Sequence, residues 1–251
     1  MATRLAAEGM HVVIADIEAP VLEATADELG VVGVRTDVTD ADNVLALRDA
    51  VLERFGAVHV VCNNAGVGGG GQIKDLTLKD WKWVIDVSLW GVIHGIHAFL
   101  PQLLANEDGG HIVNTASVAG LVSGPGLGPY NAAKYGVVAI SETLALELAA
   151  EGSKVGVSVL CPGLVRTNIF TSQRNRPQDL RNETKKTSAR SANQDIADAL
   201  LTRGIDPSVA ADRVFDAIRS GRLYVLTHPE YVAQIGERFA RIDADADAGK
   251  P

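Results

Sequence analysis

Residues 1–18, MATRLAAEGMHVVIADIE, decide the fold class of this chain. The segment MATRLAAEG has a helical pattern closed by a glycine, and HVVIAD (11–16) is a short apolar strand that ends in an acid. A helix followed by such a strand is the second part of a βαβ unit. The first strand and the glycine-rich turn of that unit would then lie before residue 1.

The alternation of strand and helix continues along the rest of the chain. The strand-like runs are almost continuously apolar, as is typical of parallel strands covered on both faces. This pattern predicts one domain, residues 1–251, built on a doubly wound parallel α/β sheet with helices on both faces. The predicted strands are 11–16, 31–37, 58–64, 111–117, 155–161 and 222–227, and the predicted helices are 20–29, 40–55, 77–104 (one helix or two), 130–150 and 206–220.

Two segments differ in composition from this pattern. Residues 168–200 are polar and basic, which is typical of a solvated loop and could also steer an anionic substrate. Residues 243–251, DADADAGKP, show no hydrophobic periodicity and are predicted to be disordered.

Composition excludes several function classes. The net charge of −8 argues against general nucleic-acid binding, which needs a basic surface. We see no apolar run near the roughly 20 residues of a membrane span and no secretory signal. Cys62 and Cys161 each end a strand-like run, so we expect buried, reduced thiols in a cytoplasmic protein. His94 and His97 share a helix face without further ligands nearby, so no metal site is expected.

Two motifs follow predicted strands at their carboxyl ends. Asp16 could accept hydrogen bonds from both hydroxyls of an adenosine ribose and would repel a 2′-phosphate, which favours NAD over NADP. An acid that merely caps the next turn is an equally open interpretation. Residues 63–66, Asn-Asn-Ala-Gly, would let a flat ligand approach the backbone, although a plain turn explains the motif in isolation. Residues 68–71, four glycines, lack the Lys-Ser/Thr pair of a phosphate loop and are interpreted as a flexible loop.

Tyr130 and Lys134 are spaced i,i+4 on a predicted helix, so they share one face. A tyrosine with an ordinary pKa near 10 is a poor base at neutral pH. A nearby ammonium, together with a cationic nicotinamide ring, would lower that pKa. Ser117, thirteen residues earlier at a strand end, could hydrogen-bond a substrate carbonyl from the opposite side, or could simply be a turn residue.

In this order the motifs carry a family resemblance. The chain resembles the short-chain dehydrogenase/reductases over essentially its whole length. The matching segments are V-I-A-D (13–16), T-D-V-T-D (36–40), N-N-A-G (63–66), G-H-I-V-N-T-A-S (110–117), Y-N-A-A-K (130–134) and C-P-G-L-V-R-T (161–167).

The resemblance implies roles for these residues. Tyr130 would be the acid/base, Lys134 would bind the nicotinamide ribose and lower the pKa of the tyrosine, and Ser117 would orient the substrate oxygen. The segment 168–200 would be a mobile substrate lid. The implied cofactor contacts are Asp16 at the adenosine ribose, Asp37 and Val38 at the adenine, Asn64 with Ala65 and Gly66 along the cleft, and Val165 and Thr167 at the nicotinamide carboxamide.

Two departures from the family pattern stand out. Ser88, in V-S-L-W-G (87–91), replaces an asparagine that in the family helps to hold a proton-relay water. A serine hydroxyl also binds water but is shorter, so we expect slower proton exchange. The phosphate-binding glycines should precede Asp16 by about 20 residues, which places them before residue 1.

The missing first strand is expected between 11–16 and 58–64, in a central position of the sheet. Because its loss would strip backbone partners from both neighbours, our preferred interpretation is a start codon assigned too late. The alternative is a shortened product that no longer catalyses.

The sequence therefore predicts an NAD-dependent oxidoreductase that transfers hydride between a small secondary alcohol or ketone and nicotinamide. Family resemblance implies a homotetramer or dimer, with the helices 77–104 and 130–150 at interfaces. No nucleic-acid or membrane partner is expected. The competing class is a nucleotide-binding or scaffold protein of the same fold without activity.

Overall fold

The computed structural model describes residues 1–183 and 202–248. Every pairing between its named strands is parallel, as the sequence predicted. Observed strands lie within or close to the predicted runs and are mostly shorter, because backbone pairing ends before the apolar pattern does. They are β1 (Val13–Asp16), β2 (Val32–Arg35), β3 (Val60–Asn63), β4 (Gly110–Thr115), β5 (Val155–Cys161) and β6 (Tyr224–Leu226).

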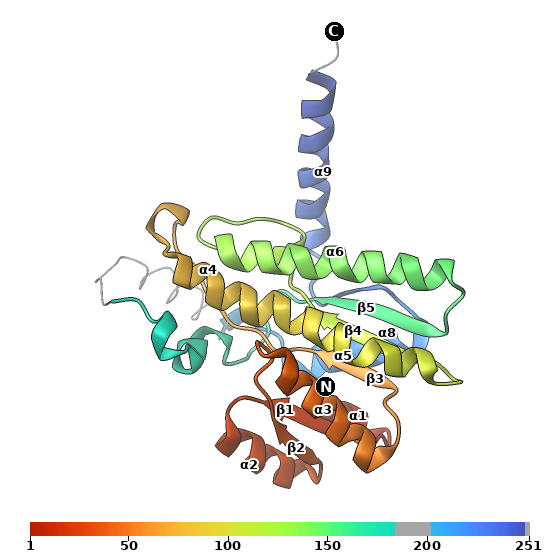
Figure 1. Cartoon of the computed structure of the whole chain (residues 1–251). Helices are drawn as coiled ribbons and strands as arrows, with labels where there is room; N and C mark the ends of the chain where they lie inside the picture. Colours follow the sequence, from red (N-terminus) through yellow and green to blue (C-terminus); the bar gives the residue numbers. More distant parts are fainter. Residues whose placement is uncertain (184–201, 249–251) are drawn as a thin grey trace.

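Helices alternate with the strands (Figure 1). Two of them begin at aspartate caps: the Asp40 carboxylate accepts hydrogen bonds from two backbone amides of α3, and Asp206 caps α8 with Pro207 at its first position. The helices are α1 (Ala2–Ala7), α2 (Ala19–Leu29), α3 (Ala41–Phe55), α4 (Leu78–Ile85), α5 (Gly91–Ala105), α6 (Gly128–Ala150), α8 (Pro207–Ser220) and α9 (Tyr231–Ala248), with the short helical turns η1 (Ile73–Asp75), η2 (Asp86–Trp90), η3 (Val118–Gly120), η4 (Ile169–Asn175) and η5 (Gln178–Leu180).

The predicted helix 77–104 consists of two helices in one continuous run. The π-helical turn η2 joins α4 to α5, which inserts an extra residue into the ladder at this point. By length and composition alone, the run Leu78–Ala105 could cross a membrane, contrary to our reading of the sequence. Its side chains Trp83, Phe99 and Leu103 are buried in the protein core, and a core helix passes the same test.

The strands form two sheets rather than one. β1 pairs with β2, and β3, β4, β5 and β6 pair in that order. Within the described residues no strand lies between β1 and β3, and both strands line a cavity of about 980 Å³. The sequence placed the missing strand between 11–16 and 58–64, and in the structure β1 and β3 belong to separate sheets and do not pair with each other.

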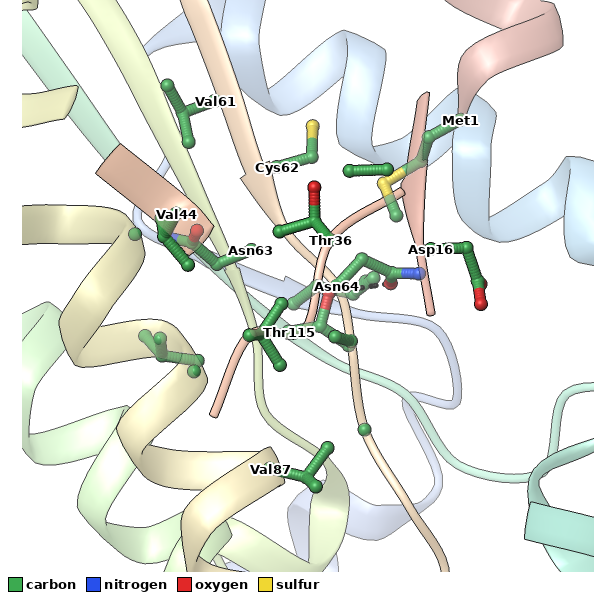
Figure 2. A pocket seen from close by; sticks show the side chains of 18 of the residues that line it. Met1, Asp16, Thr36, Val44, Val61, Cys62, Asn63, Asn64, Val87 and Thr115 are labelled. Atoms are coloured by element: carbon green, nitrogen blue, oxygen red, sulfur yellow. Dashed lines mark hydrogen bonds between the residues drawn. The ribbon is translucent and has the colours of Figure 1, made fainter. Parts of the chain in front are cut away.

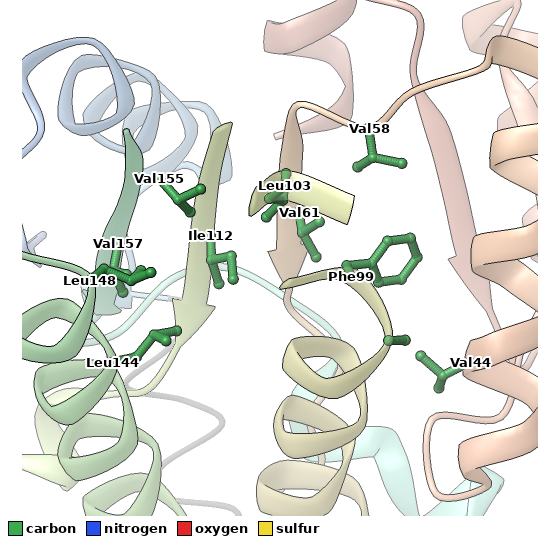
Figure 3. Packing of buried hydrophobic residues seen from close by; sticks show 11 residues of the cluster. Val44, Val58, Val61, Phe99, Leu103, Ile112, Leu144, Leu148, Val155 and Val157 are labelled. Atoms are coloured by element: carbon green, nitrogen blue, oxygen red, sulfur yellow. The ribbon is translucent and has the colours of Figure 1, made fainter. Parts of the chain in front are cut away.

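Both faces of the four-stranded sheet are covered, as the doubly wound prediction requires. Ile112 and Val113 are neighbours in β4, so their side chains point to opposite faces. Ile112 packs with α3, α5 and α6 in the cluster drawn in Figure 3, whereas Val113 packs with α8. The cluster of Figure 3 contains Val44, Val58, Val61, Ala98, Phe99, Leu103, Ile112, Leu144, Leu148, Val155 and Val157.

The disorder predicted for 243–251 was wrong over residues 243–248. Helix α9 begins at Tyr231 and continues to Ala248. Alternating alanine lacks an apolar stripe but has the highest helix propensity, so it extends a helix that has already formed. Residues 249–251 lie outside the described residues.

Candidate active site

The carboxyl ends of the strands open into the cavity of about 980 Å³ (Figure 2). Loops after parallel strands meet at this edge, which is where ligands bind in open α/β sheets. The structure brings ten of the twelve predicted site residues to the cavity wall, and Ser88 and Ser117 are not part of that wall. The ten are Asp16, Asp37, Val38, Asn64, Ala65, Gly66, Tyr130, Lys134, Val165 and Thr167.

Tyr130 and Lys134 lie on the same face of α6, as their spacing predicted. The Lys134 ammonium lies 5.8 Å from the centre of the Tyr130 ring and donates a hydrogen bond of 2.7 Å to the Thr115 carbonyl. Burial lowers the pKa of Lys134 to about 8, which still leaves it largely protonated at neutral pH.

The pKa of Tyr130 is raised by its protein surroundings, whereas the predicted lowering concerned a tyrosine beside both Lys134 and a cationic nicotinamide ring. Burial raises the pKa of Tyr130, and hydrogen bonding with Ser117 offsets only part of that rise. The Lys134 ammonium gives its hydrogen bond to Thr115 instead of the phenol oxygen, so desolvation dominates. A tyrosine in this state needs a further positive charge nearby before it can act as a base near neutral pH.

Ser117 has the turn role that the sequence left open, and its contact with a substrate oxygen stays a prediction. It caps η3, because its hydroxyl oxygen accepts a hydrogen bond from the Ala119 amide at 3.1 Å. Its hydroxyl also donates to the Pro162 carbonyl at 3.3 Å, and it interacts with Tyr130. The turn thereby fixes the serine next to the tyrosine.

Asn63 and Asn64 brace the loops around the cavity. The Asn63 amide donates to the buried Asn114 side chain at 2.9 Å, and Asn64 accepts a hydrogen bond of 2.9 Å from the Thr115 hydroxyl. A Cβ atom at Gly95 would lie 1.9 Å from the Asn63 side-chain oxygen, so only glycine fits there. The plain-turn interpretation of residues 63–66 is therefore insufficient.

Sequence reasoning missed Thr115 and Gly95 as parts of the site. Thr115 connects Lys134, through its carbonyl, with Asn64, through its hydroxyl. Position 115 lies inside a motif that we quoted, but a backbone carbonyl carries no residue-type signal. Gly95 lies inside α5 and could have been noticed, because glycine in a helix interior is unfavourable without a packing reason.

Ser88 lies in the π-helical turn η2 and is fully buried. Its side-chain oxygen accepts a hydrogen bond of 3.3 Å from the Val67 amide. A Cβ atom built on Gly66 would lie 3.6 Å from the Lys134 ammonium and 3.9 Å from the Ser88 oxygen. Ser88 and Lys134 therefore flank the same glycine, and the predicted relay role of Ser88 stays a prediction.

Asp16 and Asp37 end neighbouring strands at the cavity rim. Asp16 is exposed and accepts a hydrogen bond of 2.9 Å from the Glu18 amide, so the turn-capping interpretation applies, yet the residue also lines the cavity. Figure 2 shows it at the same opening as Asn64. Asp37 accepts a hydrogen bond of 2.9 Å from the Thr39 amide.

Val38 is held in place by helix α5. The His94 ring nitrogen bonds to the Val38 carbonyl at 2.8 Å, and a Cβ atom at Gly91 would lie 2.8 Å from a Val38 methyl group. His94 thus links helix α5 to the segment after β2. The described residues hold no group of three or more His, Cys, Asp or Glu side chains suited to a metal ion.

The described part of the predicted lid packs over the cavity. Arg174 and Asn175 both hydrogen-bond the Glu18 carboxylate, at 2.5–3.0 Å. Arg176 donates to Asp80 of α4 at 2.8 Å and lies over the Trp83 ring. These contacts connect η4 with the β1–α2 loop and with α4. The remainder of the predicted lid, 184–201, lies outside the described residues.

The glycine run 68–71 is closely packed and not a flexible loop as predicted. A Cβ atom at Gly70 would lie 2.3 Å from the Gly126 carbonyl oxygen, and one at Gly69 would lie 2.5 Å from a Val84 methyl group. Gly71 donates its amide to the Gly126 carbonyl at 2.8 Å and has a φ of +153°. Small residues are needed here for close approach of two loops.

A family profile described as short chain dehydrogenase matches residues 1–178. The chain belongs to the short-chain dehydrogenase family. Its α/β sheet, its motif order and the cavity at the carboxyl ends of the strands all agree with this membership.

Similar members of the short-chain dehydrogenase family come from several bacteria. A CLA biosynthesis dehydrogenase/reductase of Lactiplantibacillus plantarum is 32% identical over 94% of this chain and 86% of its own. A 1-deoxy-11-beta-hydroxypentalenate dehydrogenase of Streptomyces avermitilis is 35% identical over 95% of this chain and 83% of its own length. The crystal structure of a short-chain dehydrogenase/reductase from Burkholderia phymatum in complex with NAD matches with a TM-score of 0.93 and 41% identity, covering 97% of this chain and 90% of its own.

Proposed function

We propose that this short-chain dehydrogenase oxidises a secondary alcohol, or reduces the matching ketone, with NAD as cofactor. The observation that carries the proposal is the placement of Tyr130 and Lys134 on one face of α6, in the wall of the cavity that also holds Asp16. The Streptomyces relative, by its name a dehydrogenase of a hydroxylated compound, supports the choice of an alcohol substrate.

The chemistry of the cavity wall fits a dinucleotide. Asp16 offers acceptor oxygens for ribose hydroxyls, Lys134 offers a cation, and Gly66 leaves room for a flat ring beside both Lys134 and Ser88. Asp37 and Val38 would contact the adenine. Asn64 and Ala65 would line the cofactor cleft, and Val165 and Thr167 would hold the nicotinamide carboxamide. The Burkholderia protein binds NAD in a closely similar fold, which supports the same cofactor here.

The residues of this chain would divide the proton chemistry among them. In the oxidation direction, Tyr130 accepts the proton of the substrate hydroxyl, while Ser117 donates a hydrogen bond to the substrate oxygen. Lys134 holds its charge near the phenol ring and stabilises the phenolate. The bound nicotinamide supplies the hydride acceptor and, in its oxidised form, the second positive charge that Tyr130 needs. NAD is favoured over NADP because Asp16 repels a 2′-phosphate.

The decisive test compares Tyr130→Phe with Tyr135→Phe, five residues along the same helix, each assayed with NAD and NADP. We expect Tyr130→Phe to lose about 10²-fold or more in turnover of secondary alcohols, because it lacks the acid/base hydroxyl. NAD affinity, measured by calorimetry, should stay within about threefold of the unsubstituted value. Tyr135→Phe should keep its activity.

Equal activity of the two variants would contradict the role of Tyr130. NAD binding without turnover of any secondary alcohol or ketone, in the unsubstituted protein, would favour a nucleotide-binding protein of the same fold. Absence of NAD binding would remove the proposal altogether.

A further inference from the structure

Helix α9 stands away from the rest of the molecule. Figure 1 shows it projecting beyond α6 toward the C-terminus. Its 18 residues give it a length of about 27 Å. None of the four buried apolar clusters formed by the described residues includes a residue of α9. The helix therefore gains little from packing against its own chain.

One face of α9 is nevertheless apolar. Val232, Phe239 and Ile242 are 56%, 55% and 50% exposed, and Ile235 is half-buried. These four residues follow one another at spacings of three, four and three, the a and d positions of two heptads. Such a stripe is the seam along which one helix packs against another. Large apolar side chains exposed along one helix face mark an interaction surface.

The charges beside the seam select the partner and its direction. With Val232 and Phe239 at the a positions, Arg238 is a g residue and Asp243 is the following e residue. In a parallel pair of identical helices, the g residue of one copy faces the following e residue of the other copy. Arg238 of each copy would therefore face Asp243 of the other, which gives two ion pairs. An antiparallel pair that buries the same four residues would instead bring the two copies of Arg238 together.

We propose that α9 pairs in parallel with α9 of a second copy of this chain, along the seam Val232, Ile235, Phe239 and Ile242. Figure 1 shows α9 projecting beyond the other helices and strands, which leaves most of its length open to a second copy. Within the described sheet β6 is the edge strand, and α9 begins five residues after β6 ends. Arg238 lies over the Tyr135 ring of its own α6 at 5.2 Å, which holds its charge beside the seam. This contact is separate from α4, α5 and most of α6, which family resemblance places at interfaces.

Cysteine cross-linking tests the pairing in the full chain. Ile242→Cys places a thiol at a d position, where identical positions of a parallel pair lie close enough for a disulfide. The matched control is Ala240→Cys, two residues away on the outer face of α9. We expect mild oxidation to give a disulfide-linked dimer of the Ile242→Cys protein and not of the control.

Two results would overturn the proposal. One is equal cross-linking of the two variants, or no cross-linking of either. The other is a disulfide that forms only between Val232→Cys and Ile242→Cys chains expressed together, because that pattern requires antiparallel helices.

A charge exchange tests the register. In the Ile242→Cys background, Arg238→Glu should slow disulfide formation at low salt by about threefold or more, because it places two acids against each other. Adding Asp243→Lys should restore the rate. Failure of the second change to restore it would show that Arg238 does not face Asp243 of the partner.

Discussion

At the scale of single residues, the site depends on a lysine that folding places in an unfavourable position. Lys134 is 2% exposed, and its ammonium reaches one carbonyl oxygen, that of Thr115. Desolvation lowers its pKa from 10.5 to about 8. Burial of this charge therefore opposes folding at neutral pH, which is a common cost of functional sites.

This shift predicts how stability depends on pH. Between about pH 8 and 10.5 the unfolded chain holds a proton on Lys134 that the folded chain has released, so Lys134 makes the free energy of unfolding rise with pH. The slope should approach about 1.4 kcal/mol per pH unit. To measure this slope, the unsubstituted protein and Lys134→Met are unfolded in urea at intervals from pH 7 to 9.5. The difference between their free energies of unfolding is then plotted against pH.

The difference between the two proteins isolates Lys134. Cys62 and Cys161 have pKa values raised by burial to about 11 and about 12, so they make stability fall above pH 9. Both proteins contain both cysteines, so the contribution of Cys62 cancels, whereas above pH 9 the difference also includes the coupling by which Lys134 lowers the pKa of Cys161. A difference in stability that is independent of pH would contradict the shifted pKa of Lys134.

At the scale of elements, the segment from η4 to η5 is attached to α4 by a buried ion pair and by exposed hydrogen bonds of Thr77 and Lys79. Arg176 is 6% exposed and donates to Asp80 at 2.8 Å. In the part of the chain that the structure describes, its Nε and Nη2 groups are buried without a hydrogen-bond partner. Asp80 also accepts from Asn182 and closes the capping box of α4 with Thr77. One carboxylate thus organises three elements.

Removal of this carboxylate should release the segment. We expect Asp80→Ala to lower the free energy of unfolding by about 3–5 kcal/mol, because it leaves a buried guanidinium without its partner. Trypsin should also cut faster after Arg174 and Arg181. In the control, Asp86→Ala, an exposed ion pair with Lys82 is lost, so stability should fall much less than in Asp80→Ala.

A double variant separates the buried charge from the helix cap. Asp80→Ala with Arg176→Leu removes the unpaired charge and should be more stable than Asp80→Ala alone. If the double variant is equally unstable, the lost stability came from the capping box with Thr77.

At the scale of the whole molecule, the structure consists of two sheets with different support. The sheet of β3 to β6 is covered by α3, α5 and α6 on one face and by α8 on the other. The pair β1–β2 contributes no residue to the four buried clusters of the described chain. Since Asp16 ends β1, the less supported sheet carries the residue expected to select the cofactor.

This difference predicts unequal local stability. Backbone amides of Val13–Asp16 should exchange with deuterium at least about tenfold faster than those of Gly110–Thr115, because β1 has a strand partner on one side only. Mass spectrometry of peptides spanning the two strands measures the rates. β6 is the internal control: it is also an edge strand, but α8 covers it, so it should exchange more slowly than β1. Equal rates for β1 and β4 would contradict the distinction.

The sequence by itself determined the parallel α/β order, the approximate strand and helix positions, and the residues that meet at the carboxyl edge. These follow from local causes: apolar runs, caps such as Asp40, and the rule that parallel strands end together. Even the gap between β1 and β3 followed from counting the elements of one βαβ unit.

Only the tertiary structure decided what surrounds each group. Tyr130 has a raised pKa because burial outweighs a lysine that hydrogen-bonds elsewhere. Gly69 and Gly70 are fixed by contacts with distant residues, and α9 extends through a segment whose composition predicted disorder. Desolvation and steric fit depend on chain segments far apart in the sequence, so no local pattern of residues contains them.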